Sequence, residues 1–98
     1  MSLDESSPLR IEHRPEASRF EVVVDGRLCV CEYLRRDDVL LFTHTEVPRA
    51  LSGRGIAAAL VQAALDWARA EGLKVRPLCS YVAAHMRRHP QTQDLLAG

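Results

Sequence analysis

A short segment with two closely spaced glycines, residues 48–57, carries the residue types that phosphate-binding loops use. It reads Pro-Arg-Ala-Leu-Ser-Gly-Arg-Gly-Ile-Ala and joins a predicted strand to a predicted helix. Gly53 and Gly55 let the backbone approach a ligand closely. The free N–H groups of the first helical turn lie at the positive end of the helix dipole, where phosphate binds. A glycine pair at a helix start also fits a plain connecting turn, so the pair by itself leaves both interpretations open.

Two titratable side chains, His44 and Glu46, precede this segment on the same predicted strand. Because side chains two residues apart in a strand point to the same face, both are expected to lie together near the strand end. Either is suited to take a proton from an acceptor, directly or through water. Both also fit exposed strand residues without a chemical role.

Hydrophobic alternation predicts an antiparallel meander of three strands that carries these residues, over 19–24, 28–35 and 39–47. The pair Asp25-Gly26 predicts a tight hairpin turn between the first two strands. Pro48 ends the third strand because it has no N–H for a ladder. A shorter strand over 9–13 is expected at the edge. In the second strand, alternation separates Leu28, Val30 and Leu34 from Cys29, Cys31 and Tyr33.

Apolar residues at helical spacing then predict an amphipathic helix over 53–71. Ser52 is expected to cap its start, and Gly72 stands where a left-handed residue ends a helix. Residues 73–78 form a predicted buried strand, which can return parallel to the third strand through a right-handed crossover.

A second helix is predicted over 80–89, ending before Pro90. The fold class is therefore α+β, with an antiparallel meander followed by a helix, a parallel strand and a C-terminal helix. The length suits a single domain over 9–98, and residues 1–8 are expected to form a flexible tail.

The charge balance argues against several classes of partner. Thirteen basic side chains balance thirteen acidic ones in the 98 residues, so no long-range positive field attracts nucleic acid or an anionic membrane. No stretch approaches the roughly 20 apolar residues that span a bilayer. The three cysteines, an odd number, favour a reducing compartment, and no spacing fits a metal site. We therefore expect a cytoplasmic protein, a monomer or weak homodimer, without metal, nucleic acid or membrane partners.

Residues 52–57 resemble the pyrophosphate-binding signature Gln/Arg-x-x-Gly-x-Gly/Ala of the GNAT acetyltransferase superfamily. Gly55 and Ala57 occupy its last two fixed positions, and Ser52 departs from its first. The chain is also similar to a compact branch of that superfamily, of about this chain's length, through segments at 44–48, 53–57, 77–81 and 88–90. These four segments lie between residues 44 and 90.

The resemblance implies a truncated GNAT fold that binds acetyl-CoA or CoA. The pantetheine arm would lie between the third strand and the strand after the helix, where these two strands splay apart. The contacts that the resemblance implies come from the loop, the helix start, the strand end and a basic side chain: Val47, Ser52, Gly53, Arg54, Gly55, Ile56, Ala57, Ala58 and Arg88.

Four side chains are candidates for acetyl chemistry. A cysteine stands at the position of Cys79 in the compact branch, and it can act as a nucleophile if His44 or a helix N-terminus lowers its pKa. Tyr81 resembles the tyrosine that many relatives use as the acid for the leaving thiolate. Glu46 or His44 would be the base. Inert packing of Cys79 and Tyr81 on the sheet remains the alternative.

The leading hypothesis is an N-acetyltransferase that moves the acetyl group of acetyl-CoA to an unidentified amine. The alternative is a non-catalytic sensor or interaction module that binds CoA or acyl-CoA, because the strands that complete the acceptor pocket in longer relatives have no counterpart in the similar segments. A third hypothesis, a mixed disulfide between Cys79 and CoA, is weakened by the lack of a Cys-x-x-Cys partner.

Overall fold

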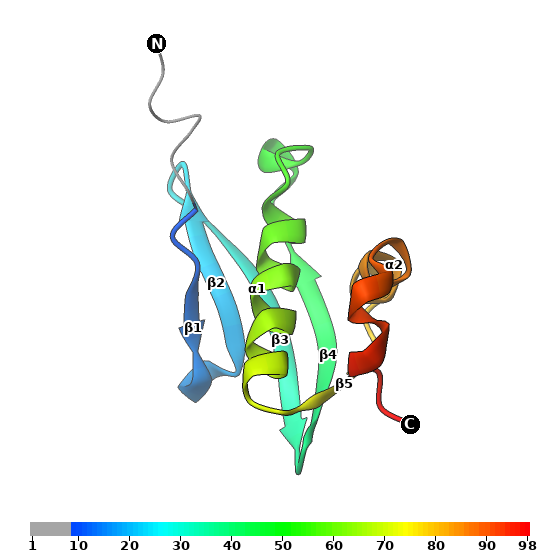
Figure 1. Ribbon diagram of the computed structural model, residues 1–98. Coiled ribbons are helices and arrows are strands. Elements are labelled where there is room, and N and C mark those ends of the chain that lie inside the picture. The colour runs from blue at the N-terminus through cyan, green and yellow to red at the C-terminus, as the bar shows by residue number, and fades with distance from the viewer. Residues whose placement is uncertain (1–8) are drawn as a thin grey trace.

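Five strands form one sheet in the order β1-β2-β3-β4-β5 in the computed structural model, which describes residues 9–98 (Figure 1). Neighbouring strands are antiparallel except β4 and β5, which are parallel. The strands are β1 (Glu12–Arg14), β2 (Arg19–Val24), β3 (Arg27–Arg36), β4 (Val39–Glu46) and β5 (Lys74–Pro77). The α+β fold predicted from the sequence is confirmed. The edge strand is shorter than expected and begins at Glu12 rather than residue 9.

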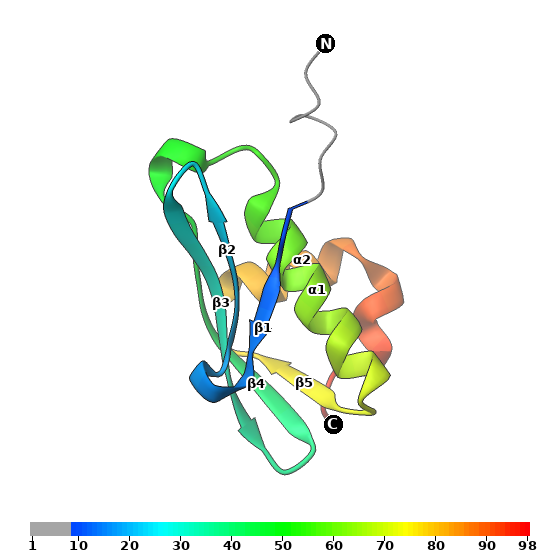
Figure 2. The same cartoon turned by 90° about the vertical axis from the view of Figure 1, so that its left-hand side faces the viewer.

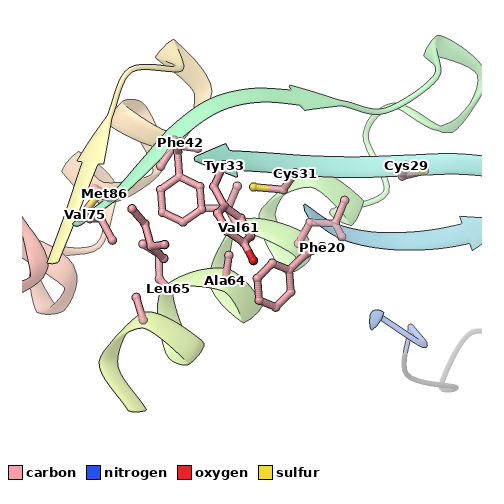
Figure 3. Packing of buried hydrophobic residues seen from close by; sticks show 14 of the residues in the cluster. Phe20, Cys29, Cys31, Tyr33, Phe42, Val61, Ala64, Leu65, Val75 and Met86 are labelled. Carbon is pink, nitrogen blue, oxygen red and sulfur yellow. The ribbon is translucent and has the colours of Figure 1, made fainter. Parts of the chain in front are cut away.

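The helices α1 (Ile56–Ala70) and α2 (Ser80–Arg88) lie on the same side of the sheet (Figure 2). The chain also forms short 3-10 helices, which are η2 (Pro15–Ala17), η3 (Arg49–Leu51) and η4 (Pro90–Leu95). The core lies between α1 and the sheet (Figure 3), where α1 buries Ile56, Leu60, Val61, Ala64, Leu65 and Ala68. Each fully buried leucine contributes about 1.5–3 kcal/mol to stability relative to an exposed one. No helix within residues 9–98 is long and apolar enough to cross a membrane.

The hairpin between β2 and β3 forms as the sequence predicts. Asp25 and Gly26 both have positive φ, 51° and 74°, as a two-residue turn that matches the strand twist requires. Alternation in β3 is also confirmed at its ends: Leu28 and Leu34 are 44% and 48% exposed. The other face of the strand, with Cys29, Cys31 and Tyr33, is buried in the core.

The start of α1 differs from the prediction. Ser52 is not its N-cap; it is extended, with ψ of 152°, and follows η3. The N-cap is Gly55, in the left-handed conformation with φ of 78°, and no side chain caps the helix there. The helix therefore begins at Ile56, because η3 and the following turn take up the residues before it. The predicted end holds: Gly72 has φ of 73°, and the N–H of Leu73 donates to Ala68 O at 2.8 Å.

Strand β5 pairs along its whole length with the first half of β4. The parallel register runs from Val39 opposite Lys74 to Phe42 opposite Pro77. Phe42 O then accepts both the N–H of Leu78, at 3.0 Å, and that of Cys79, at 2.8 Å. Beyond this point β4 continues to Glu46 while β5 has ended. The second half of β4 therefore has no strand partner on the β5 side.

A bulge in β4 lies directly after its last pair with β5. Glu32 pairs with His44, yet the next residue, Tyr33, pairs with Phe42, so Thr43 is an extra residue in β4. An extra residue reverses which side chains face the core. Leu40 and Phe42 point into the core before the bulge, and odd-numbered residues do so after it.

Candidate functional site

A pocket of about 280 Å³ opens where the start of α1, the end of β4 and the start of α2 meet. Its lining comes from Val47, Leu51, Ser52, Gly53, Gly55, Ile56, Ala57 and Tyr81. Seven of these are candidates from the sequence. The eighth, Leu51, was missed; it is the buried side chain of η3, and its only sign in the sequence is an apolar residue directly before the loop.

The glycines shape the pocket by conformation rather than by lack of space. Gly53 and Gly55 have φ of 79° and 78°, which L side chains rarely adopt, and a Cβ on either would meet no atom within 4 Å. The space beside them is therefore open.

The backbone at the start of α1 offers free donors beside this space. The N–H of Ala59 donates to Gly55 O at 3.0 Å. The N–H groups of Ile56, Ala57 and Ala58 come before Ala59 in the chain. Such groups have no acceptor within their own helix. Ala58 thus contributes an amide to the helix start, although its side chain does not line the pocket.

The two arginine candidates lie outside the pocket lining. Arg54 Nη1 donates to Asp25 Oδ2 at 2.9 Å, and both side chains are more than half exposed. This contact draws Arg54 toward the β2–β3 turn. Arg88 is exposed at the last residue of α2.

His44 and Glu46 share one face, as predicted, with His44 Nε2 and Glu46 Oε1 3.2 Å apart. Both are exposed, and the bulge turns them to the face of the sheet that the helices do not cover. Thr45 and Val47 occupy the helix side instead: Thr45 contacts Cys31, and Val47 packs against the core. The structure therefore does not bring His44 or Glu46 to the Cys79 thiol.

Cys79 is the N-cap residue of α2 and packs partly against the core. Its Sγ donates to Thr45 Oγ1 at 3.7 Å. Partial burial raises the pKa of Cys79, but the backbone N–H of Val82, the Thr45 hydroxyl and the backbone N–H of Tyr81 together outweigh burial, so this pKa lies below the ordinary value. Of the two activating neighbours considered from the sequence, the helix N-terminus is therefore the one that acts.

Thr45 is a contact that sequence reasoning missed. It stands between His44 and Glu46 in the sequence, and only the bulge turns it toward Cys79. Tyr81, two residues after Cys79, is 37% exposed and lines the pocket. Thr45 and Cys79 do not line the pocket, but each lies two residues before a side chain that does, Val47 and Tyr81 respectively. Within residues 9–98, no group of three or more His, Cys, Asp or Glu side chains is arranged to hold a metal ion.

Comparison with known proteins agrees with this geometry. The chain is 38% identical over 98 residues to Protein NATD1 of Xenopus tropicalis, covering 96% of this chain and 89% of that protein. The identity to Protein NATD1 of Homo sapiens is 37%, covering 96% and 86%. A GCN5-like protein from Staphylococcus aureus, solved by NMR, superposes with a TM-score of 0.74 at 26% identity, covering 94% of this chain and 91% of that one.

The family described as GCN5-related N-acetyl-transferase matches residues 19–95, from the first residue of β2 to the last of η4. This range contains the parallel pair β4 and β5, the pocket and Cys79. The chain therefore belongs to the GCN5-related N-acetyltransferase family.

Proposed function

We propose that this protein binds acetyl-CoA and transfers its acetyl group to an amine through Cys79. The observation that carries the proposal is a pocket that combines helix-start amides with Tyr81, together with a thiol of lowered pKa at Cys79, two residues before Tyr81. Members of this family generally use acetyl-CoA.

The pocket residues fit the parts of that cofactor. The amides of Ile56 and Ala57 are suited to a pyrophosphate, because a helix start favours negative charge. Val47 and Leu51 are apolar and suit a carbon chain. Bound acetyl-CoA would supply the acetyl group as a thioester.

The protein's own side chains support a two-step transfer. With acetyl-CoA bound, the Cys79 thiolate would accept the acetyl group as its bond to the CoA sulfur breaks, and the Tyr81 hydroxyl would give its proton to the departing sulfur. An amine would then take the acetyl group as the bond to Cys79 breaks, and the amine proton would return to Tyr81. Cys79 ends as a thiolate, and no oxidant or reductant is needed.

A second function, binding CoA without catalysis, is favoured by one observation. His44 and Glu46 are exposed on the sheet face away from Cys79, so neither candidate base lies beside the thiol. In that case the protein would act as a sensor or interaction module for CoA or acyl-CoA.

Intact-mass spectrometry after incubation with acetyl-CoA separates the two functions. Transfer through Cys79 predicts one added acetyl group that hydroxylamine removes, and its loss in Cys79→Ala while calorimetry still detects CoA binding. Cys29 and Cys31 are internal controls, because both are fully buried. Binding without an adduct and without turnover of any amine in a panel would favour the non-catalytic function. No binding at millimolar CoA would contradict both.

A further inference from the structure

The Thr45 hydroxyl contacts two sulfur atoms just beyond the end of the β4–β5 ladder. Thr45 Oγ1 is 3.7 Å from Cys79 Sγ and 3.9 Å from Cys31 Sγ. Thr45 and Cys31 are direct partners in the β3–β4 ladder, and Cys79 begins α2 on the other side of β4. Three elements therefore hold the three groups in a row, with the threonine in the middle.

The direction of the hydrogen bonds depends on whether Cys79 carries its proton. When it does, its S–H donates to Thr45 Oγ1, and the Thr45 O–H donates to Cys31 Sγ. A thiolate has no proton to donate and accepts strongly. Because a hydroxyl has one rotatable proton and two lone pairs, the same oxygen can turn its O–H from Cys31 to the charged sulfur.

Cys31 is suited to remain the neutral member of this row. It is fully buried in the core, and burial raises its pKa to about 11. Losing one weak hydrogen bond from Thr45 leaves no charge unpaired at Cys31. Two other titratable residues accompany Cys79: Cys31 on β3, on the other side of the Thr45 hydroxyl, and Tyr81 on α2. The charge of Glu32, which lies on the same strand as Cys31, also raises the pKa of Cys31.

We propose that Thr45 is a positioning residue for Cys79, whose hydroxyl accepts from the neutral thiol and turns to donate to the thiolate. The inference rests on the proposed function only in taking Cys79 as the reactive thiol. The β4 bulge is the structural cause, because without the extra residue the side chain turned toward Cys79 would be a neighbour of Thr45 in the sequence.

The test is the rate at which iodoacetamide alkylates Cys79 between pH 6 and 10, followed by peptide mass mapping. Thr45→Val removes the hydroxyl at similar volume. It is expected to move the alkylation profile to higher pH and to lower the rate at neutral pH roughly 3- to 10-fold, since each pH unit is tenfold in thiolate. Thr45→Ser keeps a hydroxyl and is expected to restore the wild-type profile.

Thr43→Val is the matched control. Thr43 is an exposed threonine of the same strand whose hydroxyl donates to Glu32 O at 3.5 Å, so its loss is expected to leave the profile unchanged. Thr45→Ala repeats the test if the valine variant does not fold. An unchanged profile in a folded Thr45 variant that lacks the hydroxyl, or a Thr45→Ser profile like that of Thr45→Val, would overturn the proposal. Alkylation needs no acetyl-CoA, so a missing acetyl adduct would contradict the proposed function and leave this test intact.

Discussion

At the residue scale, the contacts of single side chains decide which candidates reach the pocket. Arg54 lies within the glycine loop in the sequence, yet its guanidinium pairs with Asp25 on the hairpin turn. Tyr81 lies far from the loop in sequence and lines the pocket beside it. The distance of a side chain from the loop in the sequence is therefore a poor guide to whether it lines the pocket. The position of the backbone amides depends much less on side-chain identity.

We expect Arg54→Ala to leave CoA affinity within about threefold of the wild type, since Arg54 pairs with Asp25 and does not line the pocket. Calorimetric titration with CoA is the measurement, with Asp25→Asn as the matched variant at the other end of the pair. A much larger loss of affinity in Arg54→Ala than in Asp25→Asn would mean that Arg54 leaves Asp25 and contacts the phosphates when CoA binds.

At the element scale, two irregular positions make the site. The bulge at Thr43 reverses the alternation of β4, which turns Thr45 toward Cys79. The left-handed turn at Gly55 directs the chain into α1 with its amides facing open space. Regular strands and helices would have produced neither arrangement, so the site depends on where the regular pattern is interrupted.

Gly55→Val is expected to weaken CoA binding at least tenfold, because a β-branched residue is strained at φ of 78° and the turn must move. The strain is about 1–2 kcal/mol. Gly72→Val is the matched control: it carries the same kind of strain, with φ of 73°, at the other end of α1. Melting temperatures should fall in both variants, and calorimetry should find lost affinity only in Gly55→Val. Equal CoA affinities in the two folded variants would show that the loop is not the binding site.

At the scale of the whole molecule, half-buried His13 and buried His85 make stability depend on pH. His13 stacks on Phe20 with ring centroids 4.1 Å apart, and its Nε2 is 2.6 Å from the Tyr33 hydroxyl. His85 lies between α1 and α2, with Nε2 3.0 Å from Gln62 Oε1. Burial lowers the pKa of both histidines, and for His85 the neighbouring His89 and Arg88 lower it further.

A histidine whose folded pKa is lowered binds fewer protons in the folded protein than in the unfolded chain, so stability increases with pH. The contribution is complete above the unfolded value of 6.5 and is lost as pH falls below it. We expect the melting temperature to fall from pH 7 to pH 5, and to fall less in His85→Gln. His44→Gln, at an exposed histidine, is the control and should keep the wild-type slope. A melting temperature that is level across this range would contradict the prediction.

The regular parts of this molecule follow from its sequence. Asp25-Gly26 predicts the hairpin because both residues accept positive φ, and the apolar spacing of Ile56, Leu60 and Ala64 predicts the buried face of α1. The resemblance around Gly55 and Ala57 predicts the family. These properties depend on local conformation and on patterns that repeat along one element, which a sequence displays directly.

The arrangement of side chains at the site was decided by the tertiary structure. Which of His44 and Thr45 meets Cys79 depends on a single extra residue, and no local propensity marks Thr43 as that residue. The pairing of Arg54 with Asp25 joins positions 29 residues apart, so it depends on where the β2–β3 turn lies in space. Contacts between elements arise only once the sheet has formed and α1 has packed on it, because strand register and helix position are set by the whole core rather than by any one segment.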